Sequence, residues 1–173
     1  MDRAKGKANH TFAEAVTADG FVSYIASVIS GFNRIYMLQG GARRAKSDFL
    51  AGVGDSLQKQ GVTVEYLMCG LDNNMIDGLL INPVKMAIID WSCPHKLEVK
   101  HPGIVEEIVN FSDCWDKTIL ETKKKEIVKH INKFMADMEK GYHYLNTARE
   151  IHAHWEKAFT RGLDFSKAEK KTR

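Results

Sequence analysis

A short apolar run that stops at two glycines constrains the fold of this chain more than any other feature. Residues 34–39 are rich in β-branched and aromatic side chains, and Gly40 and Gly41 follow them directly. From 47 to 60 the apolar side chains fall on one face of a helix, and 62–68 alternates like a second strand. Strand, tight loop, helix and strand in this order make a right-handed βαβ crossover, so we expect the two strands to form a parallel pair.

The residues between the first strand and the helix have the outline of a phosphate-binding loop. They read Gly40-Gly41-Ala42-Arg43-Arg44-Ala45-Lys46-Ser47 and fit G-x-x-x-x-A-K-S, where the motif has G-x-x-x-x-G-K-[ST]. In such a loop the backbone N–H groups surround the phosphates, the lysine reaches the terminal phosphates and the hydroxyl binds Mg²⁺. The pattern therefore predicts that all eight residues bind a nucleotide, with Lys46 on phosphate, Ser47 at Mg²⁺ and the backbone of 41–46 as the cradle.

Ala45 replaces the last glycine of the motif. If the backbone there needs a positive φ, a Cβ costs about 1–2 kcal/mol, and its methyl group would also stand where the phosphate must approach. Arg43 and Arg44 act in the opposite direction, because each could donate a charge-assisted hydrogen bond to phosphate worth about 1.5–3 kcal/mol. These opposed effects are similar in size. A second interpretation therefore stays open, in which the glycines and basic residues only connect a strand to a helix.

A second candidate site residue lies at the end of another apolar run. Residues 86–89 are apolar throughout, as in a strand covered on both faces, and Asp90 follows them. An acid in this position opposite a phosphate loop is typical of the Walker B ligand of a Mg²⁺ ion, so Asp90 is the predicted catalytic and metal-binding carboxylate. The alternative is an aspartate that caps the next turn. Asp72 and Asp77 have the same two interpretations, as phosphate-site acids or as turn residues.

Two further regions carry helical periodicity. Apolar side chains in 17–30 predict an amphipathic helix that covers the sheet. After residue 103 the strand signals stop, and a helical stripe follows at spacings of mostly three, four or seven residues: Leu120, Ile127, Ile131, Phe134, Met138, Tyr142, Leu145, Trp155 and Phe159. One very long helix and two helices bent near Gly141 both fit this stripe. We expect two, because an isolated helix of that length usually needs a partner on which to pack.

Composition bounds the class of protein. A chain of 173 residues with a net charge of +3 is a single-domain globular protein with no charge-based reason to bind nucleic acid. Cys69, Cys93 and Cys114 are odd in number and widely spaced, which favours a reducing compartment over a disulfide framework. Residues 1–9 are polar and unlike a secretory signal, and no apolar run approaches the ~18 residues of a membrane span. We expect a cytoplasmic protein without a membrane partner, and a basic tail at 166–173.

Beyond these local patterns, the chain resembles a known family in the order and spacing of several short segments. It is similar to the N-terminal half of a poorly characterised, mostly bacterial family of P-loop ATPase-like proteins, which are built from two tandem P-loop repeats. The resemblance covers about residues 10–165. It is carried by these segments: Gly20-Phe21-Val22-Ser23, Leu38-Gln39-Gly40-Gly41, Cys69, Asp72, Asp77-Gly78, Ile89-Asp90, Pro94-His95, Pro102-Gly103 and Trp115-Asp116.

The resemblance implies roles for three residues of this chain. Lys46 and Ser47 match the family's phosphate lysine and Mg²⁺ hydroxyl, and Asp90 matches its strand-end acid. The residues at 42–45 do not match the family loop, and Trp91 stands beside the implied metal site. Separately from the resemblance, the position of His95 near the end of the Asp90 strand allows it to face the terminal phosphate, and the alternative is a loop histidine without a role. Since the chain holds one repeat, the resemblance also implies that a second P-loop repeat or a partner supplies whatever depends on the other half.

Together these observations predict a three-layer α/β domain of the P-loop NTPase type at 10–165. It would have an α/β core at 10–103 with three to five mostly parallel strands, and an appended C-terminal helical hairpin at 104–165. The leading functional hypothesis is a degenerate nucleotide-binding domain that holds ATP or GTP with Mg²⁺, an ATPase if it is active. The alternative is a non-catalytic pseudo-NTPase, an interaction module whose helical half binds a partner or forms a homo-oligomer. A small-molecule kinase is a third hypothesis, without an acceptor-site motif.

Overall fold

The computed structural model describes residues 4–92, 97–164 and 167. It divides into two compact units, of which the first comprises Met1–Val16 and Phe21–Lys125 and the second Thr17–Gly20 and Glu126–Arg173. The first unit holds the sheet, and most of the second is one helix. The predicted basic tail at 166–173 lies outside the described residues except for Lys167, and His95 lies outside them as well.

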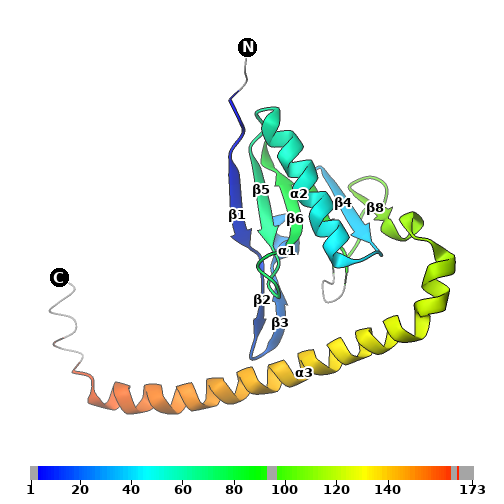
Figure 1. Cartoon of the computed structure of the whole chain (residues 1–173). Helices are drawn as coiled ribbons and strands as arrows, with labels where there is room; N and C mark the ends of the chain where they lie inside the picture. The colour runs from blue at the N-terminus through cyan, green and yellow to red at the C-terminus, as the bar shows by residue number, and fades with distance from the viewer. Residues whose placement is uncertain (1–3, 93–96, 165–166, 168–173) are drawn as a thin grey trace. The chain divides into compact units, whose positions relative to one another are not determined.

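The first unit is built on one six-stranded sheet (Figure 1). Its strand order is β1-β5-β6-β7-β4-β8, and β6 alone runs against its neighbours, so the sheet is mostly parallel as expected. The six strands are β1 (Ala8–Phe12), β4 (Arg34–Gln39), β5 (Val64–Met68), β6 (Ile76–Ile81), β7 (Met86–Asp90) and β8 (Glu106–Asn110).

The crossover around the glycine loop differs from the predicted one in its pairing. Helix α2 (Arg43–Lys59) connects β4 to β5, and these two strands are parallel within the sheet. They do not form a pair, because β7 and β6 lie between them. Strands β6 and β7 are joined by a tight 3₁₀ turn, η1 (Asn82–Val84), after which Lys85 adopts a left-handed conformation with φ 52°. A hairpin is therefore inserted into the middle of the crossover.

The prediction of a helix over 17–30 is wrong for most of these residues. The chain forms a two-stranded hairpin of β2 (Glu14–Thr17) and β3 (Gly20–Ser23), followed by the single turn of α1 (Ile25–Val28). Gly20 has φ 103°, which a helix excludes, and the Thr17 hydroxyl donates a hydrogen bond of 2.8 Å to the Gly20 carbonyl. The turn residues at 17–20 override the apolar spacing that favoured a helix.

Both faces of the sheet are covered by apolar side chains. On one face α2 packs against β5, β6 and β7 around a buried cluster of Leu38, Leu50, Val64, Tyr66 and Leu79. On the other face the buried side chains outside the strands come, among the described residues, from Ala13, α1, the residues directly after α1 and the irregular segment that includes Leu97. This cluster comprises Ala13, Ile25, Ile29, Phe32, Ile35, Met37, Leu67, Leu80, Ala87, Ile89 and Leu97.

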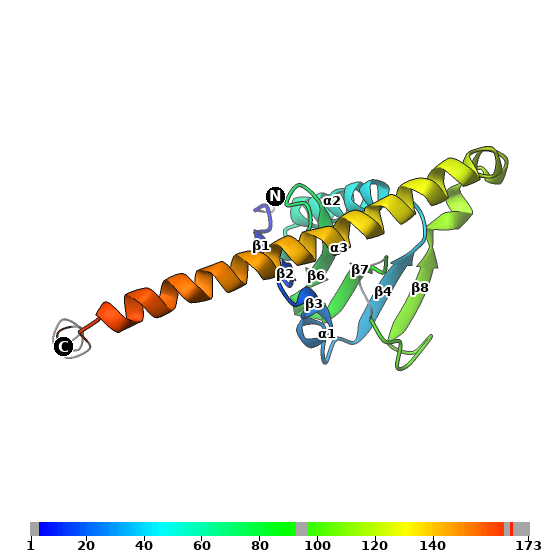
Figure 2. The same ribbon diagram turned by 90° about the horizontal axis from the view of Figure 1, so that it is seen from below.

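The second half contains a strand and one helix, where we expected a helical hairpin without strands. Strand β8 pairs in parallel with β4 at the edge of the sheet, and Figure 2 shows it beside β4, with β7 on the other side of β4. The 3₁₀ turn η2 (Phe111–Cys114) follows, and then α3 (Lys117–Gly162) runs through Gly141 without interruption. One glycine costs only about 1 kcal/mol inside a helix, which is too little to divide one of 46 residues. No helix among the described residues is apolar over a length that would let it cross a membrane.

Two glycines of α2 make a matched test of this packing. A Cβ built on Gly54 would lie 2.1 Å from the Tyr66 hydroxyl, whereas one on the exposed Gly52 meets nothing within 4 Å. We expect Gly54→Ala to destabilise the fold by about 1–3 kcal/mol through overpacking. Gly52→Ala should stabilise it by about 0.5–1 kcal/mol, because the unfolded chain loses freedom. Urea unfolding of both variants measures the two free energies, and equal effects would contradict the packing of α2 on β5.

Candidate functional site

The connection between β4 and α2 is shorter than a phosphate-binding loop. Helix α2 begins at Arg43, and Ala42 is its N-cap in an extended conformation (φ −76°, ψ 137°). Only Gly40, Gly41 and Ala42 therefore connect the strand to the helix. Ala45 lies in the first turn without a positive φ, so the strain considered for it does not arise. The predicted cradle of 41–46 is mostly helix, and the Lys46 N–H donates to the Ala42 carbonyl at 3.3 Å.

The glycine pair is needed for its conformation and for its close packing. Gly40 and Gly41 both have φ 72°, a region that favours glycine. A Cβ on Gly40 would lie 2.0 Å from Ser112 Oγ, and one on Gly41 would lie 3.0 Å from Phe111 Cβ. Both neighbours belong to η2, the turn that follows the edge strand β8. The chain itself therefore packs against the glycines that the motif reserves for a ligand.

Two carboxylates reach the helix from the middle of the sheet. In β7, Ile88 packs in the cluster under α2, so Asp90, two residues on, points to the same face. In β6, Leu79 packs in that cluster too, and Asp77 therefore shares this face. The antiparallel register pairs Gly78 with Ile89 and so brings the two aspartates to the same end of the sheet. Each aspartate is 1% exposed.

Lys46 is directed into the protein and paired with Asp90. Its side chain is 0% exposed, and its Nζ donates a hydrogen bond to Asp90 Oδ1 at 2.5 Å. The same Nζ also donates to the Ser92 hydroxyl. A buried ammonium without partners would be far more costly than one neutralised in this way. The lysine that the motif assigns to phosphate thus has a carboxylate as its partner.

Arg43 forms the second ion pair of the site. One of its terminal nitrogens donates to both carboxylate oxygens of Asp77, at 3.0 and 3.2 Å, and lies 3.1 Å from the Cys69 sulfur. Its Nε lies 4.0 Å from Asp90 Oδ2 and makes no hydrogen bond. We call Arg43, Lys46, Asp77 and Asp90 the buried charge cluster. It holds two cations and two anions, so its formal charge is balanced.

Burial acts on two of the ionisable groups in this region. Burial alone would lower the pKa of the Arg43 guanidinium, but Asp77, Cys69 and Asp90 together raise that pKa above its ordinary value. Burial raises the pKa of the Cys69 thiol, and the neighbouring Asp77 carboxylate adds to this effect. Cys69 is therefore a protonated, unreactive thiol at neutral pH, and the arginine stays charged.

Both predicted Mg²⁺ ligands, Ser47 and Asp90, are engaged with other groups of the protein in this structure. Ser47 is buried, and its hydroxyl accepts a hydrogen bond of 2.9 Å from the Ile76 N–H, which holds α2 against β6. The Asp90 carboxylate is already paired with Lys46. Mg²⁺ requires several oxygen ligands in near-octahedral geometry. In the part of the chain that the structure describes, no group of three or more His, Cys, Asp or Glu side chains could hold a metal.

The remaining candidates separate into turn and surface residues. Asp72 accepts a 3.0 Å hydrogen bond from the Asn74 N–H, which is the turn role considered for it. Arg44 is exposed and pairs with Asp48 one turn along α2. Sequence patterns missed the pairing of Arg43 with Asp77, although the Asp77-Gly78 segment stood out in the family resemblance. The sequence did contain a signal for the meeting of the two aspartates. Asp77 lies two residues before Leu79 and Asp90 two residues after Ile88, so each aspartate shares a strand face with an apolar residue.

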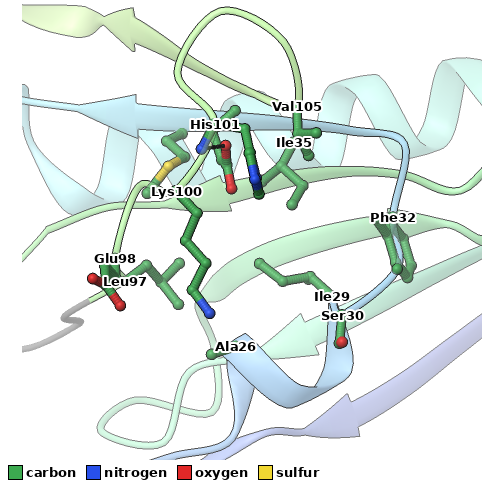
Figure 3. Close-up of a pocket in the computed structure, with 13 residues that line it drawn as sticks. Ala26, Ile29, Ser30, Phe32, Ile35, Leu97, Glu98, Lys100, His101 and Val105 are labelled. Carbon is green, nitrogen blue, oxygen red and sulfur yellow. Dashed lines mark hydrogen bonds between the residues drawn. The ribbon is translucent and has the colours of Figure 1, made fainter.

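A pocket against the sheet lies apart from these residues. It has a volume of about 570 Å³ and opens between α1 and the segment 97–106 (Figure 3). Its floor consists of apolar side chains from the face opposite α2, among them Ile35 and Met37. At its rim the buried Glu106 carboxylate accepts a 2.7 Å hydrogen bond from the His101 N–H. None of the loop residues 40–47 lines it.

Comparisons with family models, with curated proteins and with solved structures find no match for this chain. The resemblance to a two-repeat P-loop family and the assignment of residues 40–47 and 90 to nucleotide and Mg²⁺ stay predictions.

The Lys46–Asp90 pair can be tested by a double-mutant cycle. We expect Lys46→Met or Asp90→Leu alone to destabilise the fold by about 3–5 kcal/mol, because each leaves one buried charge without its partner. The double variant should lose much less than the sum, since both charges are then gone. Urea unfolding gives the free energies. Arg44→Ala is the control on the same helical turn, and its exposed pair should contribute less than about 1 kcal/mol. Additive losses would contradict the buried pair.

Proposed function

We propose that this chain is a non-catalytic interaction module, a pseudo-NTPase in which the phosphate-loop residues maintain the fold. One observation carries the proposal: the Lys46 side chain is 0% exposed and forms a 2.5 Å ion pair with Asp90. The lysine and the acid that a working NTPase directs at phosphate and Mg²⁺ neutralise each other here. The supporting feature is the rest of the cluster, where Arg43 is likewise neutralised by Asp77.

A phosphate would have to compete with two buried carboxylates. To reach the Lys46 ammonium it would displace Asp90 and leave that carboxylate buried beside another anion, which is unfavourable in a low-dielectric interior. It would also lack the usual donors, because the residues from Arg43 onward are already helical and the glycines pack against η2. The loop geometry and the charge balance therefore support the same role.

The interaction half of the proposal rests on α3. None of its residues is buried, although it carries many large apolar side chains. An apolar stripe on a helix of 46 residues is stabilised mainly by packing, since helical propensity alone is marginal in water. Docking against another helix would bury this stripe. A module of this kind acts through what it binds and needs no catalytic residue.

Nucleotide binding is the second candidate, and one observation favours it. Lys46 and Asp90, two residues that the motif predicts, do meet in space, and Ser47 lies beside Lys46 in the same helical turn. In this candidate Asp90 would leave the lysine when ATP or GTP binds with Mg²⁺. No observation favours the small-molecule kinase.

Calorimetric titration with MgATP and MgGTP separates the two candidates. We expect no binding heat from the unmodified protein at nucleotide concentrations up to about 1 mM. A Kd of about 1 mM corresponds to a binding free energy of about −4.1 kcal/mol. Ala45→Gly is the informative variant, because it restores the last glycine of the motif and leaves the charge cluster intact. It should not bind either, since Lys46 stays paired with Asp90.

Two controls accompany the titration. Inorganic tripolyphosphate tests whether the loop recognises phosphate without a base, and Arg44→Ala tests for weak attraction by an exposed arginine. Sub-millimolar binding of either nucleotide by the unmodified protein, unchanged in Arg44→Ala, would overturn the pseudo-NTPase proposal and establish the second candidate.

A further inference from the structure

We propose that α3 pairs with α3 of a second copy of this chain as an antiparallel two-stranded coiled coil. This inference rests on the proposed function, because it names the partner of the interaction module. The pairing would be centred between Met138 and Gly141. The apolar pattern along α3, the distribution of large and small side chains and the charged core position Lys124 carry it.

Eight of the large apolar side chains of α3 fall on a heptad repeat. Spacings of four and three residues define two series of core positions, the first being Lys124, Ile131, Met138, Leu145, His152 and Phe159, and the second Leu120, Ile127, Phe134, Gly141, Ala148 and Trp155. Large side chains in these series are exposed, including Ile131 at 54% and Trp155 at 56%. The repeat covers about 40 residues, or roughly 60 Å of helix, and exceeds the three to four heptads that indicate a coiled coil.

The sizes of the core residues favour the antiparallel direction. In a parallel dimer in register, Gly141 would face Gly141 of the partner subunit and Ala148 would face the partner's Ala148, which leaves two layers underfilled. In the antiparallel dimer each residue of the first series faces one of the second. Met138 then faces the partner's Gly141, and Ile131 faces the partner's Ala148. Every small residue is thus opposite a large one.

The charged core position Lys124 favours the same direction. A parallel dimer would place Lys124 against the partner's Lys124 and repel it. In the antiparallel dimer Lys124 faces the partner's Trp155, where an ammonium over the indole ring is attracted by the cation–π interaction. One like-charge contact counts against the antiparallel dimer, since Glu121 would face the partner's Glu156. Both glutamates lie at exposed flanking positions, where salt screens their repulsion.

Mass and label-to-label distances test the dimer and its direction. The chain is 19.6 kDa, so light scattering should give twice this mass. Spin labels are attached to a cysteine introduced at Thr122 or at Lys140, one site at a time, and both sites face solvent. Cys93→Ser and Cys114→Ser remove two native thiols that would also take the label, and Cys69 is kept because it is buried. The antiparallel dimer places the two 140 labels within about 30 Å and the two 122 labels beyond about 50 Å, since 35 residues of axial offset span roughly 52 Å. Short distances at both sites would mean a parallel dimer and overturn the proposal.

A matched pair of variants tests the seam itself. Phe134→Glu places a charge in the core series, and Asn132→Glu places the same charge two residues away on the solvent side. We expect Phe134→Glu to raise the dimer Kd by about a hundredfold or more, and Asn132→Glu to leave it nearly unchanged. Equal effects would overturn the proposed seam.

The outcomes distinguish this inference from the function on which it rests. An unmodified protein that is monomeric at every concentration tested overturns the dimer, but the absence of nucleotide binding would then still support a non-catalytic module with a different partner. Nucleotide binding together with an antiparallel dimer would overturn the proposed function and leave the dimer standing.

Discussion

The buried charge cluster is the constraint on which the sheet and its main helix depend. Arg43 and Lys46 lie in the first turn of α2, which contains no acidic residue. Cations at this end are unfavourable, because the N-terminus of a helix is the positive end of its dipole. Asp77 and Asp90 supply the opposite charges from the two central strands. The start of α2, the short glycine connection and the position of α2 across β6 all follow from this pairing.

The parts of the fold that sequence patterns predicted are those set by local residue types. Strand β4 occupies the predicted residues 34–39, and β7 coincides with the apolar run that ends in Asp90. Both strands have a neighbour on each side and are covered on both faces, so the residues between their ends form an unbroken apolar run. The helix after the loop was also predicted, although it begins four residues earlier, because the charges that hold its first turn come from distant strands. The meeting of Arg43 with Asp77 required the direction of β6, which no local pattern reveals.

The errors have different physical origins. A helical spacing of apolar residues near 17–30 arose from a hairpin followed by a single turn, and a glycine with positive φ decided between them. Strand β8 was missed because it is a short edge strand of two glutamates, two apolar residues and an asparagine, which shows no alternation, and a proline and a glycine come shortly before it. The two-helix expectation rested on the need of a long isolated helix for a packing partner, but the helix continues through Gly141, where one glycine costs only about 1 kcal/mol. The loop motif located a real cluster of charged residues, in which Lys46 pairs with Asp90.

The two edges of the sheet bear on how copies of this protein can associate. Strands β1 and β8 are five residues each, and β1 is a polar Ala-Asn-His-Thr segment before Phe12. On β8, Glu107 pairs with Arg34 of the neighbouring strand and keeps charge at the margin. Short, polar and charged edges discourage another chain from adding a strand. Both edges therefore disfavour self-association by strand addition, which is a common route to aggregation in proteins with open sheets. A contact between helices would let copies of this protein associate without using those edges.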